Sequence, residues 1–107
     1  MRKLGFLLSI TGLLLLLCVV AGANDGDLEN GKKVYADQKC KLCHSIEGVG
    51  NKTNPLDGVG SKLSSEDITK YIVAPKEINS DSKMLAYPKL EEKDLKDLVA
   101  YMLSLKS

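Results

Sequence analysis

Hydrophobic residues divide the chain into a leader and a folded part. Residues 4–20 carry no charge and are dominated by leucine, whereas from residue 24 onward apolar and charged positions are mixed. The second part contains three stretches in which apolar residues recur every three or four positions, the spacing of one face of an α-helix. No stretch alternates with a period of two. The pattern therefore predicts an all-α domain without a sheet.

The three predicted helices cover residues 27–38, 64–75 and 91–105. Asp27 is a candidate cap for the first, and Pro75 ends the second. The third has acidic residues in its first turn and an apolar stripe formed by Leu95, Leu98, Val99, Met102 and Leu105. Residues 45–62 and 76–88 are rich in glycine, proline and polar residues and are predicted loops. A loop of about 18 residues in so small a domain normally surrounds something.

Size and charge narrow the classes of function. The chain has 107 residues, and removing residues 1–23 leaves 84, of which 31 are apolar and none is tryptophan. A core this thin needs a disulfide, a metal or a cofactor to be stable. Residues 24–107 carry 13 lysines against 14 acidic residues, a net charge of −1. Nucleic acid is therefore not an expected partner.

The leader, residues 1–23, has the features of an export signal. It begins with Arg2 and Lys3, continues with an apolar stretch, and ends with small residues at the −3 and −1 positions, Ala21 and Ala23, before polar Asn24. We therefore expect residues 24–107 to form the mature domain and to work in the periplasm. In the alternative, the 20 uncharged residues 4–23 stay as an anchor on the outer face of the cytoplasmic membrane.

Cys40, Cys43 and His44 form the clearest chemical motif. On one helical turn, positions i, i+3 and i+4 share a face. Two thiols with this spacing form thioethers to two neighbouring vinyl groups of one haem, and the adjacent imidazole binds the iron. A zinc site would need a fourth ligand, a redox dithiol would need strand–helix–strand surroundings, and a disulfide here would close too small a loop to stabilise much. One covalently attached haem c is the favoured cofactor.

Together with motifs on either side, this segment resembles the class I cytochrome c family in its small monohaem bacterial form, over residues 27–106. The matching pieces are Gly31 and Tyr35, the Cys40 to His44 motif, residues 54–58, residues 82–88 and residues 98–102. The resemblance implies a small cytochrome c fold, with three to four helices and long loops around the haem. The absence of tryptophan departs from many relatives and leaves the propionate contacts unassigned.

The same resemblance implies two contacts. Gly31 and Tyr35 would cross Leu98 and Tyr101 where the first and last helices pack. The carbonyl of Pro55 would accept the Nδ1 proton of His44, which fixes the ring and makes its other nitrogen a better iron ligand.

The second axial ligand of the haem iron is found by elimination among the side chains other than His44 that could bind iron. His44 is the only histidine, and Met1 belongs to the leader. Met102 lies on the apolar stripe of the last helix, where methionine normally fills core space. Met84 lies in an otherwise polar loop and is the predicted ligand. Lys83 is the alternative, but its amine would have to lose a proton to bind iron.

Iron held by His44 and Met84 has no free position, so the sequence predicts a one-electron carrier and not an enzyme. We expect a monomer with other redox proteins as donor and acceptor, and no small-molecule substrate. Two alternatives are a haem subunit of a larger oxidoreductase complex and a ligand-binding sensor. Four lysines lie near the motif or the Met84 loop and form either a docking ring for acidic partners or an ordinary scattered surface: Lys41, Lys52, Lys83 and Lys89.

Overall fold

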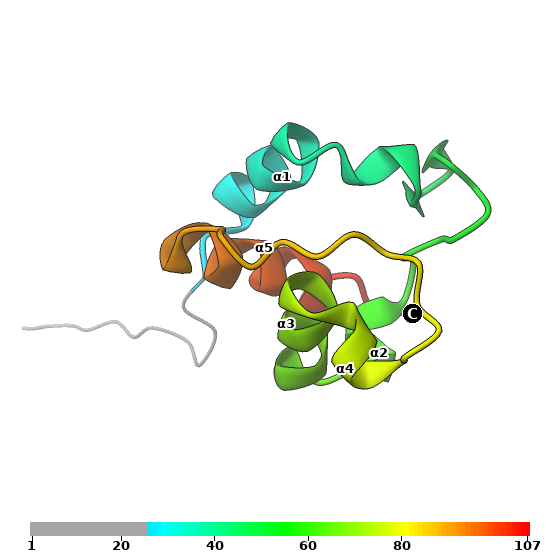
Figure 1. Ribbon diagram of the computed structural model, residues 1–107. Coiled ribbons are helices and arrows are strands. Elements are labelled where there is room, and N and C mark those ends of the chain that lie inside the picture. The colour runs from blue at the N-terminus through cyan, green and yellow to red at the C-terminus, as the bar shows by residue number, and fades with distance from the viewer. Residues whose placement is uncertain (1–25) are drawn as a thin grey trace, which may run out of the picture.

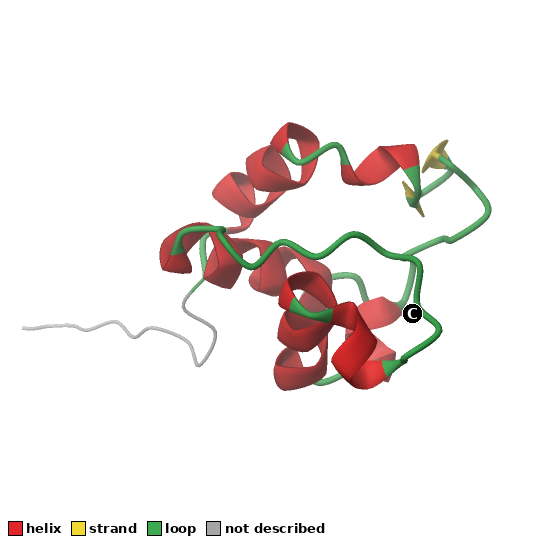
Figure 2. Cartoon of the chain, viewed as in Figure 1, coloured by secondary structure: helices red, strands yellow, loops and turns green. Residues whose placement is uncertain are grey.

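The computed structural model describes residues 26–107, and this part of the chain is mostly helical. The predicted leader, residues 1–23, lies outside the described residues. The elements are α1 (Leu28–Asp37), the 3₁₀ helix η1 (Cys40–Leu42), β1 (Ser45–Ile46), β2 (Val49–Gly50), α2 (Val59–Lys62), α3 (Ser65–Val73), α4 (Pro75–Ile78) and α5 (Glu92–Leu103) (Figures 1 and 2). The predicted helical fold class is confirmed. No helix among residues 26–107 is both long enough and apolar enough to cross a membrane.

The predicted Asp27 cap is present, and Ser64 caps α3. One carboxylate oxygen of Asp27 accepts hydrogen bonds from the backbone amides of Glu29 and Asn30, at 2.9 and 3.2 Å. Helix α1 begins at Leu28, directly after this cap. The hydroxyl of Ser64 accepts from the amide of Asp67 at 3.1 Å at the start of α3. Each cap satisfies amides that the first helical turn leaves without partners.

Pro75 ends α3 as predicted, but it also begins α4, inside the region expected to be loop. A proline has no amide hydrogen to lose at the first position of a helix, and its fixed φ suits that position. One residue therefore stops one helix and starts the next. The rest of the predicted loop, up to residue 88, has no helix or strand.

The region 45–62 is not entirely loop, which corrects the expectation of a domain without a sheet. Strands β1 and β2 pair antiparallel, with Ser45 opposite Gly50 and Ile46 opposite Val49. The turn between them is made by Glu47 and Gly48, which have φ values of 52° and 82°, as a tight hairpin turn requires. Strands of two residues are too short to show alternation. Helix α2 closes the same region after Gly58.

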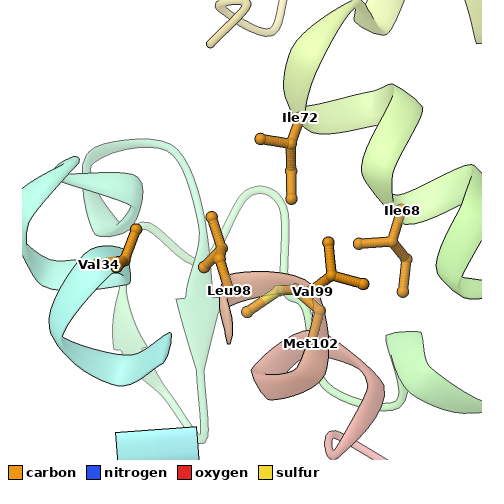
Figure 3. Close-up of a cluster of buried hydrophobic side chains, with 6 residues drawn as sticks. All are labelled: Val34, Ile68, Ile72, Leu98, Val99 and Met102. Carbon is orange, nitrogen blue, oxygen red and sulfur yellow. The ribbon is translucent and has the colours of Figure 1, made fainter. Parts of the chain in front are cut away.

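Helix α5 forms the centre of the core and contacts α1, α2 and α3. In Figure 3, its side chains lie between α1 on one side and α3 on the other. The buried apolar cluster consists of Val34, Ile68, Ile72, Leu98, Val99 and Met102. Met102 is only 6% exposed, so its predicted role as core packing is confirmed.

The predicted crossing of the first and last helices is also confirmed. A Cβ atom added to Gly31 would meet the carbonyl oxygen of Asp97 and come within 2.8 Å of the Cβ of Tyr101. Only glycine permits this approach. One helical turn further on, the rings of Tyr35 and Tyr101 pack edge to face, with centroids 5.8 Å apart and planes at 84°.

A buried carboxylate holds the start of α1 against α5. Asp97 is 2% exposed, and its oxygens accept from the backbone amide of Asp27 at 2.7 Å, the side-chain amide of Asn30 at 2.8 Å and the ammonium of Lys93 at 2.6 Å. These donors, with Lys93 the largest contributor, lower the pKa of Asp97 to about 2. The charged form is thus the one that the fold stabilises.

Acid should therefore loosen the contact between the two helices. The pKa of Asp97 is lower in the folded chain than its ordinary value of 3.8, so its contribution to stability is present above about pH 4 and is lost as the pH falls through about 2. We expect Asp97→Asn to lower the melting temperature by several degrees at pH 7, with the difference from wild type vanishing near pH 2. Asp37→Asn, which removes an exposed carboxylate paired with Lys33, is the control. Equal effects of the two variants at pH 7 would contradict this account.

Candidate haem site

The Cys40 to His44 segment folds as one tight turn directly after α1. Lys39 has a left-handed backbone with φ 59°, which redirects the chain into η1. The carbonyl of Cys40 then accepts from the amides of both Cys43, at 3.1 Å, and His44, at 3.0 Å. These bonds keep the three chemical groups on one turn. Both cysteines are free thiols, Cys40 half-buried and Cys43 exposed, and burial raises the pKa of Cys40.

The imidazole of His44 is oriented by a backbone carbonyl. Its Nδ1 lies 3.0 Å from the carbonyl oxygen of Asn54. Because a carbonyl can only accept, Nδ1 carries the proton, and Nε2 is the nitrogen with a lone pair for a metal. The arrangement of a metal-binding histidine is therefore present.

The carbonyl belongs to Asn54 and not to Pro55, which corrects the expected partner. Pro55 forms a parallel bridge with Ser45, in which the amide of Ser45 faces the carbonyl of Asn54 at 3.4 Å and the amide of Leu56 donates to the carbonyl of Ser45 at 2.8 Å. Successive carbonyls of an extended chain point in opposite directions. With Asn54 facing the histidine, the carbonyl of Pro55 faces away from it.

Asn51 is a supporting residue that sequence reasoning missed. Its amide donates to the carbonyls of both Lys41 and His44 at 3.0 Å, and its side-chain amide donates to the carbonyl of Leu42 at 3.1 Å. Gly50 comes so close that an added Cβ would meet the carbonyl oxygen of His44. The hairpin thereby folds back onto the motif and holds its shape. The sequence feature that could have indicated this support is Gly50, the glycine before Asn51, whose backbone has φ 109°.

Met84 lies in the segment that joins α4 to α5. This segment, yellow to orange in Figure 1, passes between the layer with α1 and η1 and the layer with α3 and α4. Met84 is half-buried, and its amide donates to the hydroxyl of Ser82 at 3.2 Å. It lines a largely apolar hollow of about 510 Å³, together with Ala74, Pro75 and Leu85.

Two tyrosines on different elements, Tyr35 on α1 and Tyr87 in the Met84 segment, have raised pKa values. Burial raises the pKa of Tyr87, and the sulfur groups of Cys40 and Cys43 raise it further. The amide of Tyr87 donates to the carbonyl of Ile72 at 2.8 Å, which fixes this part of the segment to α3. Burial, and next the charge of Cys40, raise the pKa of Tyr35 to about 12. The Met84 segment is thus tied to α3 by a backbone hydrogen bond.

Comparison with known proteins agrees with this arrangement. The family model described as "Cytochrome c" matches residues 28–106. The chain is 28% identical over 85 residues to cytochrome c oxidase subunit 2 of Alkalihalophilus pseudofirmus, covering 71% of this chain and 25% of that protein. It is 42% identical over 64 residues to cytochrome c-550 of Paracoccus denitrificans, covering 51% of this chain and 40% of that protein.

A third relative is matched over most of its length. Cytochrome c 2.1 of Caenorhabditis elegans is 29% identical over 98 residues, covering 72% of this chain and 87% of that protein. In contrast, the chain spans a quarter to two fifths of the length of the two bacterial relatives.

The residues present fit the haem c that this family carries. Two free thiols lie on one turn, the adjacent imidazole has Nδ1 held and Nε2 available, and the buried hydroxyl of Tyr35 has no partner within the protein. No group of three or more His, Cys, Asp or Glu side chains within residues 26–107 is arranged to hold a metal ion by itself. Iron that arrives within a porphyrin needs only axial ligands from the chain. The chain belongs to the cytochrome c family, whose members bind haem c covalently.

Proposed function

We propose that this chain is a one-electron carrier with a single haem c, attached through Cys40 and Cys43 and ligated by His44 and Met84. The observation that carries the proposal is the held imidazole, whose Nδ1 donates to the Asn54 carbonyl at 3.0 Å. This bond fixes the ring and strengthens Nε2 as a donor to iron.

Met84 is proposed as the second ligand because the other candidates are used elsewhere or are unsuitable. Met102 is packed in the core at 6% exposure. The ammonium of Lys83 is exposed and would have to be deprotonated. Met84 is half-buried and lines a hollow that is mostly apolar but also has Lys76, Glu77 and Lys83 in its lining, and its neutral sulfur can bind iron without losing a proton.

The proposed ligand set explains transfer of electrons without a substrate. The bound haem supplies a one-electron couple. His44 and Met84 would occupy both axial positions, so a substrate would have to displace a ligand. A thioether stabilises ferrous iron relative to ferric iron, which gives a positive potential. The chain's task is then to hold two ligands unchanged between oxidation states.

We place the carrier outside the cytoplasm, on the basis of residues 1–23. Their basic start, apolar stretch and small residues before Asn24 support export, and an uncleaved leader would instead tether the domain to the outer face of the membrane. Covalent haem attachment in an exported protein agrees with either arrangement.

A second candidate is a haem module bound within a larger oxidoreductase. It is favoured by the likeness to cytochrome c oxidase subunit 2, in which the matching stretch is a quarter of the protein. Size-exclusion chromatography of the native extract separates the two proposals. A free carrier elutes as a small monomer, whereas a module elutes with its partner.

Docking by charge is also testable. Lys41, Lys52, Lys83 and Lys89 are all exposed. If they steer acidic redox partners, the rate of reduction by such a partner falls as ionic strength rises. A rate that is independent of salt would indicate that these lysines are ordinary surface residues.

We expect the purified protein to hold its haem through covalent bonds. Acid and organic solvent should fail to extract the pigment, and the mass should equal that of the mature chain plus one haem. The reduced protein should show the optical spectrum of a low-spin c-type haem. Colourless protein after extraction would contradict the proposed attachment.

A further inference from the structure

Helix α2 is fixed to the segment that follows α5 through the backbone of one glycine. Gly60 is buried, and its amide donates to the carbonyl of Leu105 at 2.8 Å. Its carbonyl accepts from the ammonium of Lys106 at 3.0 Å. Figure 1 shows this last segment of the chain beside α2. Both polar groups of the Gly60 backbone are therefore used to hold α2 in place.

The contact leaves no room for a side chain at this position. A Cβ atom added to Gly60 would meet the carbonyl oxygen of Leu103, the last residue of α5. The end of α5 is anchored in the core by Met102, whereas α2 has only four residues and no side-chain cap at its start. A helix this short has little stability of its own. An alanine at position 60 would therefore displace α2 and not α5.

Helix α2 is in turn connected to the carbonyl that holds the imidazole. The amide of Val59 donates to the carbonyl of Leu56 at 3.0 Å, and the amide of Leu56 donates to a carbonyl of β1 at 2.8 Å. Two residues before Leu56, the carbonyl oxygen of Asn54 lies 3.0 Å from Nδ1 of His44. Pro55 lies between them and has a fixed φ, so a shift of Leu56 is passed on to the Asn54 carbonyl.

The histidine and its carbonyl partner are placed by different contacts. The backbone of His44 is held by the motif turn and by the amide of Asn51 at 3.0 Å. The bonds that tie Asn54 directly to this region are longer, 3.3 Å from its side-chain amide to the carbonyl of Cys43 and 3.4 Å from the amide of Ser45 to its own carbonyl. Long hydrogen bonds are weak. The position of the Asn54 carbonyl therefore depends on the rest of its loop and on α2.

We propose that Gly60 is a positioning residue for the axial histidine, because its fit against α5 places α2 and thereby sets the hydrogen bond between the Asn54 carbonyl and Nδ1 of His44. This inference rests on the proposed ligation by His44. A held Nδ1 proton makes Nε2 a stronger donor, and a stronger donor stabilises ferric iron relative to ferrous iron. A looser fit of α2 should weaken the bond and raise the midpoint potential.

The test compares Gly60→Ala with Gly31→Ala in the haem-loaded protein. Gly31 meets the carbonyl of Asp97 on the same helix α5, but from α1, so both variants should lower the melting temperature. His44 is the only histidine, so its Nδ1 proton is identified directly by NMR of the ferrous protein. In Gly60→Ala this signal should move upfield, as expected for a longer hydrogen bond, and the midpoint potential should rise. Gly31→Ala should leave the Nδ1 signal at its wild-type position.

Unchanged values in Gly60→Ala, or equal shifts of the Nδ1 signal in the two variants, would overturn the inference, because Gly60 would then act on stability alone. Failure of the proposed ligation is recognised separately, since the wild-type protein itself would lack the optical spectrum of a low-spin haem.

Lys106→Met decides the question if Gly60→Ala does not accumulate. It removes the donor to the Gly60 carbonyl without adding a side chain to α2. Lys62→Met is its control, because Lys62 is exposed on α2 and its replacement removes the same charge. The Nδ1 signal of His44 should move upfield in Lys106→Met, by less than in Gly60→Ala, and should stay in place in Lys62→Met. No shift in Lys106→Met, or the same shift in both lysine variants, would contradict the role of this contact.

Discussion

Without its haem, the chain should lose most of its helical structure. The apolar cluster among residues 26–107 has six members, and no large side chain there is fully buried. Apolar side chains that a core would normally take up remain exposed instead, among them Leu42 at 65%, Val49 at 67% and Leu85 at 69%. So small a core does not offset the conformational entropy of ordering some 80 residues.

The double variant Cys40→Ala/Cys43→Ala provides the haem-free chain. Its far-UV circular dichroism should show a minor fraction of the helical signal of the haem-loaded protein, and heating should give no cooperative transition. The single variants Cys40→Ala and Cys43→Ala serve as the graded comparison, because each leaves one thiol for attachment. They should mature poorly and accumulate at low levels. A native-like helical spectrum in the double variant would show that the core is sufficient alone.

The long elements were predictable because each has its own local signals. Helix α3 has the Ser64 cap at one end and Pro75 at the other, and α5 has an apolar stripe over three turns. These signals act within a few residues of one another, so a single sequence contains them. The contact between Gly31 and α5 was predictable only through the resemblance to a family, because no residue near Gly31 indicates which distant segment it packs against.

The short elements depend on contacts that a sequence does not display. Helix α2 has four residues, and an added Cβ at its Gly60 would meet the carbonyl of Leu103, so the helix is defined by the chain packed against it. The hairpin is likewise held by Asn51 on the motif. A periodic pattern of apolar residues can be recognised only over several helical turns or several strand positions. Helix α2 and the two strands are too short to show one.

The site was predictable in its side chains but not in its backbone. Cys40, Cys43 and His44 are contiguous, and their spacing alone indicates the chemistry. Which carbonyl faces the imidazole depends on the direction of the peptide groups around Pro55, and that direction is set by the bridge to Ser45. The orphan hydroxyl of Tyr35 is a consequence of packing and has no sequence signal beyond tyrosine itself.

Replacing Met84 should change the haem strongly while preserving its attachment. If Met84 is the second ligand, Met84→Ala opens the sixth position of the iron. The ferrous protein should then bind carbon monoxide rapidly at neutral pH, and the midpoint potential should fall because the thioether no longer favours the reduced state. The weak far-red band of iron–thioether ligation should disappear from the ferric spectrum. The haem should stay attached, since Cys40 and Cys43 are unchanged.

Met102→Leu is the matched control, because it removes the other thioether of the described chain from the core. Met102 packs with Leu98 and Val99, and leucine conserves its volume, so the variant should lose less than about 1.5 kcal/mol of stability. Its far-red band and its potential should match those of the wild type, and it should not bind carbon monoxide. If the band survives in Met84→Ala and vanishes in Met102→Leu, the ligand is the other methionine. If Met84→Ala keeps the band and Met102→Leu does too, neither methionine binds the iron.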